Sequence, residues 1–379
     1  MTTATAPAPA RRGRRRGATN GGEQAAGWLF TLPAIVIIGV FLILPILLAL
    51  WVSFTDWNGR RSPLFNDSVD FVGGENYGTI LTDDGLTREL FGRAIRNNVY
   101  YVLFVVPLQT MLALFLAVQV NNRLLKAKGF FRTAFYFPSV TSSIAITGVF
   151  LFLFSTSGVV NVMLSWVGIT GPNWMANGDG VIHSLLGVFG VDSPPAGWNE
   201  PGFLGVSAWS WIGGPSVAQC VLIILAVFTT SGTFMLLFLA GLQNVGGEIS
   251  EAAAVDGATK WTAFWRITLP MLRPTLFTVL TLGLIGTWQV FDQVYLTANT
   301  PAAQTLTSPA YMAYNQAFEN HEPGIAAAIA FVLFLIIVVL SLFQRWVLRD
   351  REAGSRRQLR SFLRAAEEGR LARVGEGQR

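Results

Sequence analysis

Long apolar runs separated by polar segments dominate the pattern of this chain. A helix needs roughly 20 apolar residues to cross about 30 Å of hydrocarbon, and six runs are long enough. They cover residues 28–54, 99–120, 133–155, 217–241, 275–297 and 325–347. The pattern therefore predicts an all-α membrane protein, a six-span helical bundle, with residues 28–347 as its transmembrane domain.

Composition supports this interpretation. Charged residues make up only 13% of the chain and hydrophobic residues 52%, whereas soluble domains carry roughly a quarter charged residues. The single cysteine, Cys220, excludes an intrachain disulfide. The two histidines lie far apart without a second ligand nearby, so we expect no metal site. The net charge of +5 does not indicate nucleic acid, because the basic residues gather at the ends of the apolar runs.

Basic residues alternate between the connections that join the predicted spans. They occur in the N-terminal arm, in the second-to-third and fourth-to-fifth connections and in the tail, but not in residues 156–216 or 298–324. The positive-inside rule then places both termini in the cytoplasm of a multi-pass protein of the cytoplasmic membrane. The first-to-second connection fits less well, since seven acids accompany its five arginines, but an even number of spans places it outside.

The two ends of the chain are polar. Residues 1–27 are rich in Ala, Thr, Pro, Gly and Arg and have little to bury, which predicts a disordered basic cytoplasmic arm. Residues 348–379 form a charged cytoplasmic tail. There an apolar stripe of Leu359, Phe362 and Leu363 leaves two alternatives open, a helix lying on anionic lipid and a solvated tail.

The segment 243–274, between the fourth and fifth spans, predicts two short helices joined by a turn. Glu and Ala residues favour a helix from Glu248 to Val255, and Asp256-Gly257 is a turn signal. Thr259 is placed to cap a second helix that runs to about Thr268.

Other residues of the segment 243–274 predict how it connects to its surroundings. Pro270 and Pro274 are expected to break the second helix ahead of the fifth span. The small side chains of Ala252 and Ala253 would let a partner's groove approach closely. Aromatic residues are expected to anchor the segment to its own bundle: Trp261, Phe264 and Trp265.

The spacing inside the segment is its most specific feature. Glu251-Ala252-Ala253 is followed after three residues by Gly257, and nine residues separate Gly257 from Ile267-Thr268-Leu269-Pro270. An alanine-rich amphipathic connector is the alternative, but it does not account for the full spacing. In this loop the chain resembles the permease subunits of bacterial ATP-binding-cassette importers, and more specifically the carbohydrate-uptake branch, similar to the larger maltose-type and glycerol-phosphate-type permeases. The resemblance covers about residues 28–350 and extends to Phe71–Tyr77, Phe130–Thr133, Phe135–Pro138 and Val290–Tyr295.

The resemblance implies a set of partners and a function. Glu251, Ala252, Ala253, Gly257, Ile267, Leu269 and Pro270 match the family's coupling loop, which seats in a cleft of a cytoplasmic ATP-binding-cassette ATPase, present in two copies. A second homologous permease subunit and an extracytoplasmic solute-binding protein complete the importer. The expected function is ATP-driven import of a sugar, a di- or oligosaccharide, through a permease that is not an enzyme and carries no cofactor.

Two observations from the residues themselves qualify this expectation. The sequence has no Gly-x-x-x-x-Gly-Lys-Ser/Thr phosphate loop, so ATP hydrolysis is assigned to a partner chain. Family members often carry Gly-Gly-Pro after the fifth span, whereas this chain has Ala298–Pro301, and its connection 156–216 is longer than usual. Both departures fall on the predicted outer side.

Polar residues inside the spans are the candidates for a solute path, because polar groups in membranes are costly and face the interior. One set lies in the fourth span, where helix packing through small polar residues is an equal alternative: Thr229, Thr230 and Ser231. A second set, toward the outer half of the fifth span, combines an aromatic face with amide and carboxylate groups suited to a sugar: Trp288, Gln289, Asp292 and Gln293. For Asp292 the alternative is a position in water at the outer interface.

A weaker patch of polar residues comprises Thr141, Ser142, Ser143 and Thr147. The tryptophans of 156–216 are expected to lie at the lipid interface.

Two other classes of protein fit the residues less well. An ion-coupled secondary transporter typically needs several ionisable groups within the membrane, and Asp292 is the only acid inside the six predicted spans. A membrane enzyme acting on lipid-linked sugars would need acidic or histidine groups near the interface, for which the acids of the first outer connection are the only candidates.

Overall fold

The structure of the protein is a computed structural model, which describes residues 21–60, 62, 69–122, 125–191 and 193–347. Regular structure in these residues is helical, and beyond two isolated bridges, Thr55–Phe71 and Gly180–Ser216, they form no strand. Five helices are long and apolar enough to cross a membrane, or up to six if one bent pair counts as a single span. The all-helical fold is confirmed, whereas the count of six is not. Residues 1–20 of the predicted arm and the predicted tail 348–379 lie outside the described residues.

The chain divides into two compact units, of which the first ends at Val52. Its described part is one helical stretch made of α1 (Gly21–Ile38), a π-helix (Gly39–Ile43) and α2 (Leu44–Val52). The π-helix ends just before Pro45 in the chain, where the missing proline N–H makes the ordinary i→i−4 bonding pattern impossible. Residues 25–52 of this stretch form one of the five candidate spans.

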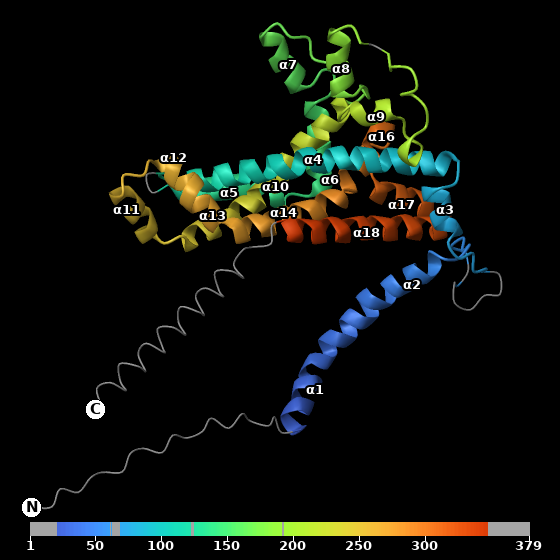
Figure 1. Ribbon diagram of the computed structural model, residues 1–379, viewed down its shortest axis with the longest axis horizontal. Helices are drawn as coiled ribbons and strands as arrows, with labels where there is room; N and C mark the ends of the chain where they lie inside the picture. The colour runs from blue at the N-terminus through green and yellow to red at the C-terminus, as the bar shows by residue number, and fades with distance from the viewer. Residues whose placement is uncertain (1–20, 61, 63–68, 123–124, 192, 348–379) are drawn as a thin grey trace, which may run out of the picture. The chain divides into compact units, whose positions relative to one another are not determined.

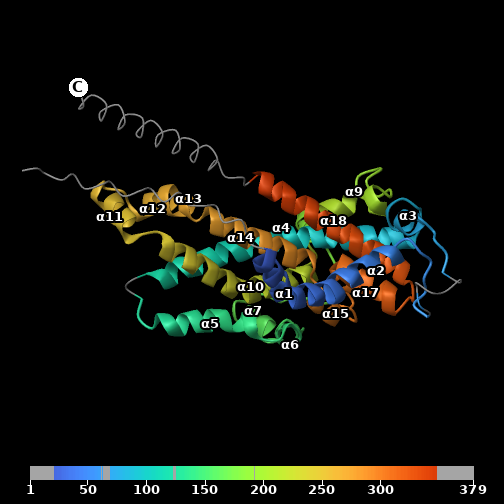
Figure 2. The ribbon, with the colours of Figure 1, turned by 90° about the horizontal axis from the view of Figure 1, so that it is seen from below.

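The second unit is built around four long helices that lie side by side in both views (Figures 1 and 2). They are α4 (Leu86–Asn121), α10 (Val217–Asn244), α14 (Arg273–Trp288) and α18 (Pro323–Val347). The pair α4 and α10 supplies more than half of the buried hydrophobic side chains of the described residues, including Val105 and Leu225, neither of which is exposed. In a membrane such pairs are held by close packing and not by the exclusion of water.

The predicted third span, 133–155, is wrong as a single continuous helix. The structure has α5 (Lys128–Val140) and α6 (Ser143–Leu153), bent by 96° at the break between them. Pro138 lies in the last turn of α5 and removes a backbone donor, and the Thr141 hydroxyl donates to the carbonyl of Phe137 at 3.1 Å. The extended backbone of Thr141 and Ser142 then starts α6 in a new direction.

The predicted fifth span, 275–297, is also interrupted. Helix α14 ends at Trp288, and α15 (Asp292–Thr297) begins after a short non-helical stretch. Side chains from other helices satisfy two carbonyls at the interruption. Asn98 Nδ2 donates to the Trp288 carbonyl at 3.3 Å, and Ser308 Oγ donates to the Val290 carbonyl at 2.7 Å. Within a membrane, non-helical backbone is tolerated only where it is buried in protein or lines a cavity.

Shorter helices occupy the two ends of this second unit (Figure 1). One end carries α11 (Gly247–Val255), α12 (Lys260–Ala263), a π-helix (Phe264–Thr268) and α13 (Leu269–Met271). Toward the other end lie α3 (Glu75–Leu81), the 3₁₀-helix Phe203–Gly205, α9 (Ala208–Ile212), α16 (Ala303–Leu306) and α17 (Pro309–Phe318). Two more short helices, α7 (Val159–Trp166) and α8 (Val181–Val188), project from the side of the bundle (Figure 1).

Three tryptophans of the long connection make contacts within the fold. Trp174 donates its Nε1–H to Asn161 at 2.7 Å. The ring of Trp209 stacks on His183 at 4.4 Å, and Trp211 packs against an apolar cluster of the bundle. Trp166 and Trp198 remain exposed.

Gly232 of α10 gives a direct test of how closely α5 and α10 pack. A Cβ at this position would lie 2.2 Å from the carbonyl oxygen of Phe135, so Gly232→Ala must push the helices apart. We expect the free energy of unfolding to fall by about 1–3 kcal/mol, the usual cost of overpacking. Thermal unfolding in detergent measures the effect.

The matched control is Gly148→Ala in α6, where a Cβ would meet nothing within 4 Å. This variant is expected to be as stable as the parent, or slightly more so because alanine favours helix. Equal losses in both variants would contradict a close contact between α5 and α10.

Candidate functional site

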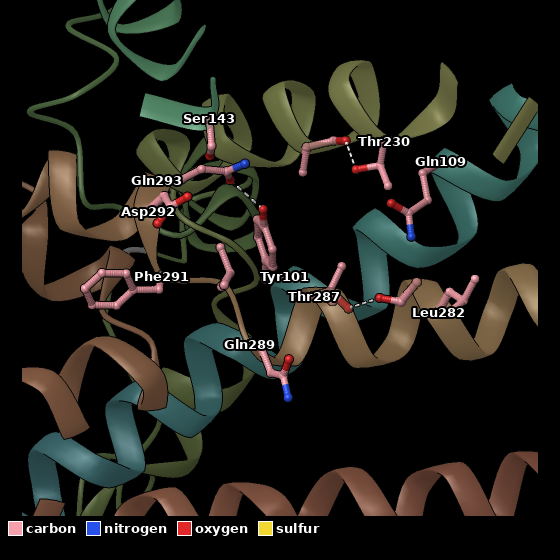
Figure 3. Close-up of a pocket in the computed structure, with 14 residues that line it drawn as sticks. Tyr101, Gln109, Ser143, Thr230, Leu282, Thr287, Gln289, Phe291, Asp292 and Gln293 are labelled. Atoms are coloured by element: carbon pink, nitrogen blue, oxygen red, sulfur yellow. Dashed lines mark hydrogen bonds between the residues drawn. The ribbon is translucent and has the colours of Figure 1, made fainter. Parts of the chain in front are cut away.

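A cavity of about 290 Å³ lies beside the interruption between α14 and α15 (Figure 3). Helices α4, α6, α10, α14 and α15 all contribute to its lining. The polar side chains that line it are Tyr101, Gln109, Ser143, Thr230, Thr287, Gln289, Asp292 and Gln293. The interruption thus places polar groups of the fifth span opposite polar groups of the second and fourth.

Two kinds of hydrogen bond fix the lining groups. The Tyr101 hydroxyl donates to Gln293 Oε1 at 2.7 Å, so the carbonyl end of that amide is occupied and its NH₂ end is the part left for a ligand. The hydroxyls of Thr230 and Thr287 donate back to the carbonyls of Ala226 and Gly283, each at 2.7 Å. Each threonine oxygen keeps its lone pairs and remains an acceptor.

Gln109 is the least expected residue of the cavity. Its side chain is 0% exposed, and neither its Oε1 nor its Nε2 has a hydrogen-bond partner in the described part of the chain. Gly283 leaves it room, because a Cβ there would lie 2.5 Å from Gln109 Nε2. An unpartnered buried amide costs about 1–3 kcal/mol, so its place beside a cavity makes Gln109 a candidate for binding a ligand. The only sequence signal is an amide inside an apolar run.

The structure brings together some of the residues expected on the solute path and not others. Thr230, Gln289, Asp292 and Gln293 line the cavity. Trp288 does not, since it is 4% exposed and packs in an apolar cluster. The cavity's aromatic groups are instead Tyr101 and Phe291.

Thr229 and Ser231 also lie away from the cavity lining. Their hydroxyls donate to the carbonyls of Leu225 and Val227, one turn earlier in α10. Ser139 of α5 donates to the Thr229 carbonyl. These contacts match the packing alternative for this part of the fourth span.

The chemistry of the cavity suits an uncharged, hydroxyl-rich ligand. Asp292 is the only formally charged side chain in the lining, where the other polar groups are amides and hydroxyls. Such groups bind through directed hydrogen bonds, and Tyr101 and Phe291 add aromatic surface. The described residues hold no cluster of His, Cys, Asp and Glu that would bind a metal ion.

The segment α11–α13 forms a helix, a turn and a second helical stretch. Gly257 has a φ of +78°, a left-handed conformation that costs other residues about 1–2 kcal/mol. The turn is closed by the bond from the Ala258 N–H to the Ala253 carbonyl at 2.9 Å, as in a helix that ends with glycine. Thr259 Oγ1 accepts from the Thr262 N–H at 3.2 Å and caps the second stretch.

The residues that define the spacing of this segment are partly exposed and partly buried. Glu251 and Ala252 are exposed, whereas Ala253 is 6% exposed. Ile267, Leu269 and Pro270 are half-buried. The first helix therefore presents Glu251 and Ala252 outward, while the second stretch turns Ile267, Leu269 and Pro270 partly toward the chain.

Two expectations for this segment hold only in part. Pro270 does not break the helix, because it sits in the first turn of α13 after a π-helix, where a missing N–H is tolerated. The helix ends at Leu272 instead, directly ahead of Arg273-Pro274 at the start of α14, as expected for Pro274. Trp261 and Trp265 are 72% and 50% exposed, so of the three expected aromatic anchors only Phe264 is half-buried.

A different contact joins the segment to the fourth span. Leu272 is 1% exposed, and a Cβ added to Gly241 would lie 2.9 Å from its Cδ2 and 2.6 Å from Thr275 Oγ1. Gly241 lies near the end of α10, and Leu272 and Thr275 lie where α13 meets α14. Leu272, two residues after Pro270, therefore fixes the segment α11–α13 to the bundle.

A helical membrane bundle with a polar cavity at an interrupted helix, and with an exposed helical segment at one end, defines a solute-transporting class of membrane protein. Comparison with known proteins identifies the family. Residues 109–352 match the family described as "Binding-protein-dependent transport system inner membrane component", and the chain belongs to it. It is a multi-pass permease of the carbohydrate-uptake branch of ATP-binding-cassette transporters.

Relatives and solved structures agree with this assignment. The chain is 34% identical over 331 residues to the lactose transport system permease protein LacF of Rhizobium radiobacter, covering 86% of this chain and 95% of the relative. It is 30% identical to the arabinooligosaccharides transport system permease protein AraP of Bacillus subtilis, covering 84% and 87%. A crystal structure of a bacterial alginate ABC transporter, in complex with a periplasmic protein bound to an alginate pentasaccharide, superposes with a TM-score of 0.64 at 20% identity, covering 86% and 95%. That last likeness shows the fold.

Gln109 gives a prediction about stability. Gln109→Leu removes two buried polar atoms that lack partners and keeps a similar volume, so the free energy of unfolding is expected to rise by about 1–3 kcal/mol. Thermal unfolding of the purified chain measures it. The control is Gln289→Leu, at an exposed cavity residue, for which a change within about 0.5 kcal/mol is expected. A less stable Gln109→Leu protein would show that the amide is satisfied within the chain.

Proposed function

We propose that the chain carries a di- or oligosaccharide across the cytoplasmic membrane as the permease subunit of an importer driven by ATP hydrolysis in partner ATPases. The observation that carries the proposal is the segment α11–α13, which has the family's coupling spacing on an exposed helix–turn–helix at one end of the bundle. The polar cavity and the names of the relatives support a sugar as the transported solute.

The distribution of charge supports an orientation with α11–α13 in the cytoplasm. Lys128 starts α5, and Lys260, Arg266 and Arg273 lie on or beside the segment, so these basic residues gather toward one end of the bundle (Figure 1). Toward the other end, Arg88 and Arg93 form ion pairs with acids one turn away, which offsets their charge. The positive-inside rule then gives cytoplasmic termini.

The coupling mechanism follows from the contacts of the segment. Two copies of the ATPase would close on ATP, and a cleft in one of them would hold the exposed face of α11, with Glu251 and Ala252. Ala253 and Gly257 shape that face, while Ile267, Leu269 and Pro270 set the second stretch against the chain. Movement would reach α10 and α14 through Leu272, which packs closely on Gly241.

The cavity would form one wall of the sugar path. Thr230, Gln289, Asp292 and Gln293 offer hydrogen bonds to sugar hydroxyls, and Gln109 adds an unpartnered amide. A second homologous permease would supply the opposite wall, and an extracytoplasmic solute-binding protein would deliver the sugar. Alternating access to this cavity completes the transport cycle without chemistry on the sugar.

An ion-coupled secondary transporter is the competing mechanism. The described cavity offers one carboxylate, Asp292, and no histidine, lysine or arginine beside it, which gives a proton relay too few members. Uptake that persists after the partner ATPase is inactivated, while ion gradients are maintained, would favour that mechanism over ours.

Gln293 tests the sugar path. Gln293→Leu removes the amide that Tyr101 orients, so we expect sugar uptake by cells with the complete importer to fall about tenfold, the effect of losing one hydrogen bond worth about 1.4 kcal/mol. Uptake of radiolabelled lactose, maltose and arabinotriose measures it. Gln243→Leu, the same change at an exposed residue near the end of α10, is the control. Equal uptake in both variants would remove Gln293 from the path.

Gly257 tests the coupling. Gly257→Val strains the left-handed turn and places a bulky side chain on the exposed segment, where nothing in the chain lies within 4 Å of an added Cβ. We expect membrane insertion and ATP hydrolysis to persist while sugar uptake per ATP hydrolysed falls at least tenfold. Reconstituted importer in proteoliposomes allows both rates to be measured together.

Two further variants separate backbone strain from bulk. Gly257→Asn tolerates a positive φ but adds volume, so uncoupling by this variant would indicate contact with a partner. Gly246→Ala, at a negative φ with no neighbour within 4 Å, is expected to transport normally. Normal coupling in Gly257→Val would count against the mechanism.

A further inference from the structure

A second cavity of about 290 Å³ lies toward the opposite end of the bundle from α11–α13, and it shares no lining residue with the first. The first third of α4, the start of α10, α16 and the long connection 156–216 enclose it. Its lining consists of polar residues and glycines. More than half of the lining residues come from this connection, so it builds most of a site that is separate from the first cavity.

Arg96 distinguishes this cavity. Its side chain is half-buried, Nη2 donates to Asn97 Oδ1 at 2.9 Å, and its buried Nε has no partner among the described residues. Arg88 and Arg93 on the same helix are paired with Asp84 and Glu89, whereas no described carboxylate lies within 4 Å of the Arg96 guanidinium.

A half-buried arginine without a carboxylate partner favours the binding of an anion. A guanidinium binds carboxylates and other oxyanions through charge-assisted hydrogen bonds, which are about twice as strong as neutral ones. A partly buried charge without a counter-ion destabilises the fold, and a bound anion removes that cost. Asp179 also lines the cavity, but it is exposed and forms no ion pair with Arg96.

His183 stands in the same lining, and its position is fixed. Its ring stacks on Trp209 with centroids 4.4 Å apart and 11° between planes, and Nε2 lies 3.1 Å from the Trp209 carbonyl oxygen. A Cβ on Gly213 would lie 2.7 Å from His183 Cε1, so the glycine leaves the ring its space. Gln304 accepts from Arg93 Nη1 at 3.2 Å and orients a second guanidinium toward the cavity.

We propose that this second cavity binds a small carboxylate or related oxyanion, with Arg96 as the principal binding residue and Arg93 and His183 beside it. Hydroxyl and amide groups of Ser210 and Gln304 in the same lining provide hydrogen bonds for a ligand that carries hydroxyls next to its charge. The site is separate from the sugar path. On the proposed orientation it lies toward the extracytoplasmic end of the bundle.

The test is equilibrium dialysis of the full chain in lipid nanodiscs against radiolabelled glucuronate and glucose, which differ in a carboxylate for a hydroxymethyl group. We expect saturable 1:1 binding of glucuronate at millimolar or lower concentration, competition by sulfate and no saturable binding of glucose. Arg96→Gln should weaken glucuronate binding at least tenfold. The control Arg88→Gln, which removes a paired arginine of the same helix, should leave binding unchanged.

Arg96→Lys keeps the positive charge and should bind glucuronate more tightly than Arg96→Gln but less tightly than the parent, because lysine lacks the planar fork. If Arg96→Gln fails to fold, the contrast between glucuronate and glucose on the parent chain and the Arg96→Lys result still decide the question. Equal binding of glucuronate and glucose, absence of saturable glucuronate binding, or equal losses in Arg96→Gln and Arg88→Gln would overturn the proposal. These measurements need neither ATP nor a partner subunit, so their failure leaves the transport proposal standing.

Discussion

The interrupted fifth span depends on one constraint: backbone carbonyls freed inside a membrane bundle need hydrogen-bond donors. Asn98 of α4 donates to the Trp288 carbonyl, and Ser308, which caps α17, donates to the Val290 carbonyl. These bonds let the chain leave the helix after Trp288 and start α15 at Asp292. The cavity exists because of this interruption, since Gln289, Asp292 and Gln293 reach it from the broken segment.

The outline of the fold was readable from sequence because the length of an apolar run is a strong signal for a membrane helix. The turn in α11–α13 was readable for a similar reason, since Gly257 and Thr259 each have one favoured local role. The interruption after Trp288 was not, because it depends on donors at Asn98 and Ser308, which are distant in the chain. Local composition carries no information about such contacts.

The sequence predicts only part of the candidate site, namely the polar residues that stand out inside an apolar span. Asp292 and Gln293 drew attention as polar residues inside a span, and both line the cavity. Trp288 was also expected on the solute path but does not line the cavity, because the interruption separates its buried ring from the residues after it. Gln109 is not predicted from the sequence, since an amide in an apolar run is not informative until its lack of hydrogen-bond partners is known. The sequence alone does not predict where a proline ends a helix, because its effect depends on the turn in which it lies. Pro138 lies in the last turn of α5, whereas Pro270 lies in the first turn of α13.

The contact between Gly241 and Leu272 has a consequence for the kinds of motion that the fourth and fifth spans permit. The absence of a side chain at Gly241 lets Leu272 and Thr275 sit against the backbone of α10. Sliding of one helix along the other would force these atoms into the neighbouring turn of side chains, which are larger, whereas a pivot about the glycine keeps the same atoms in contact. The contact therefore favours a change in the angle between α10 and α14 over a sliding of one helix along the other.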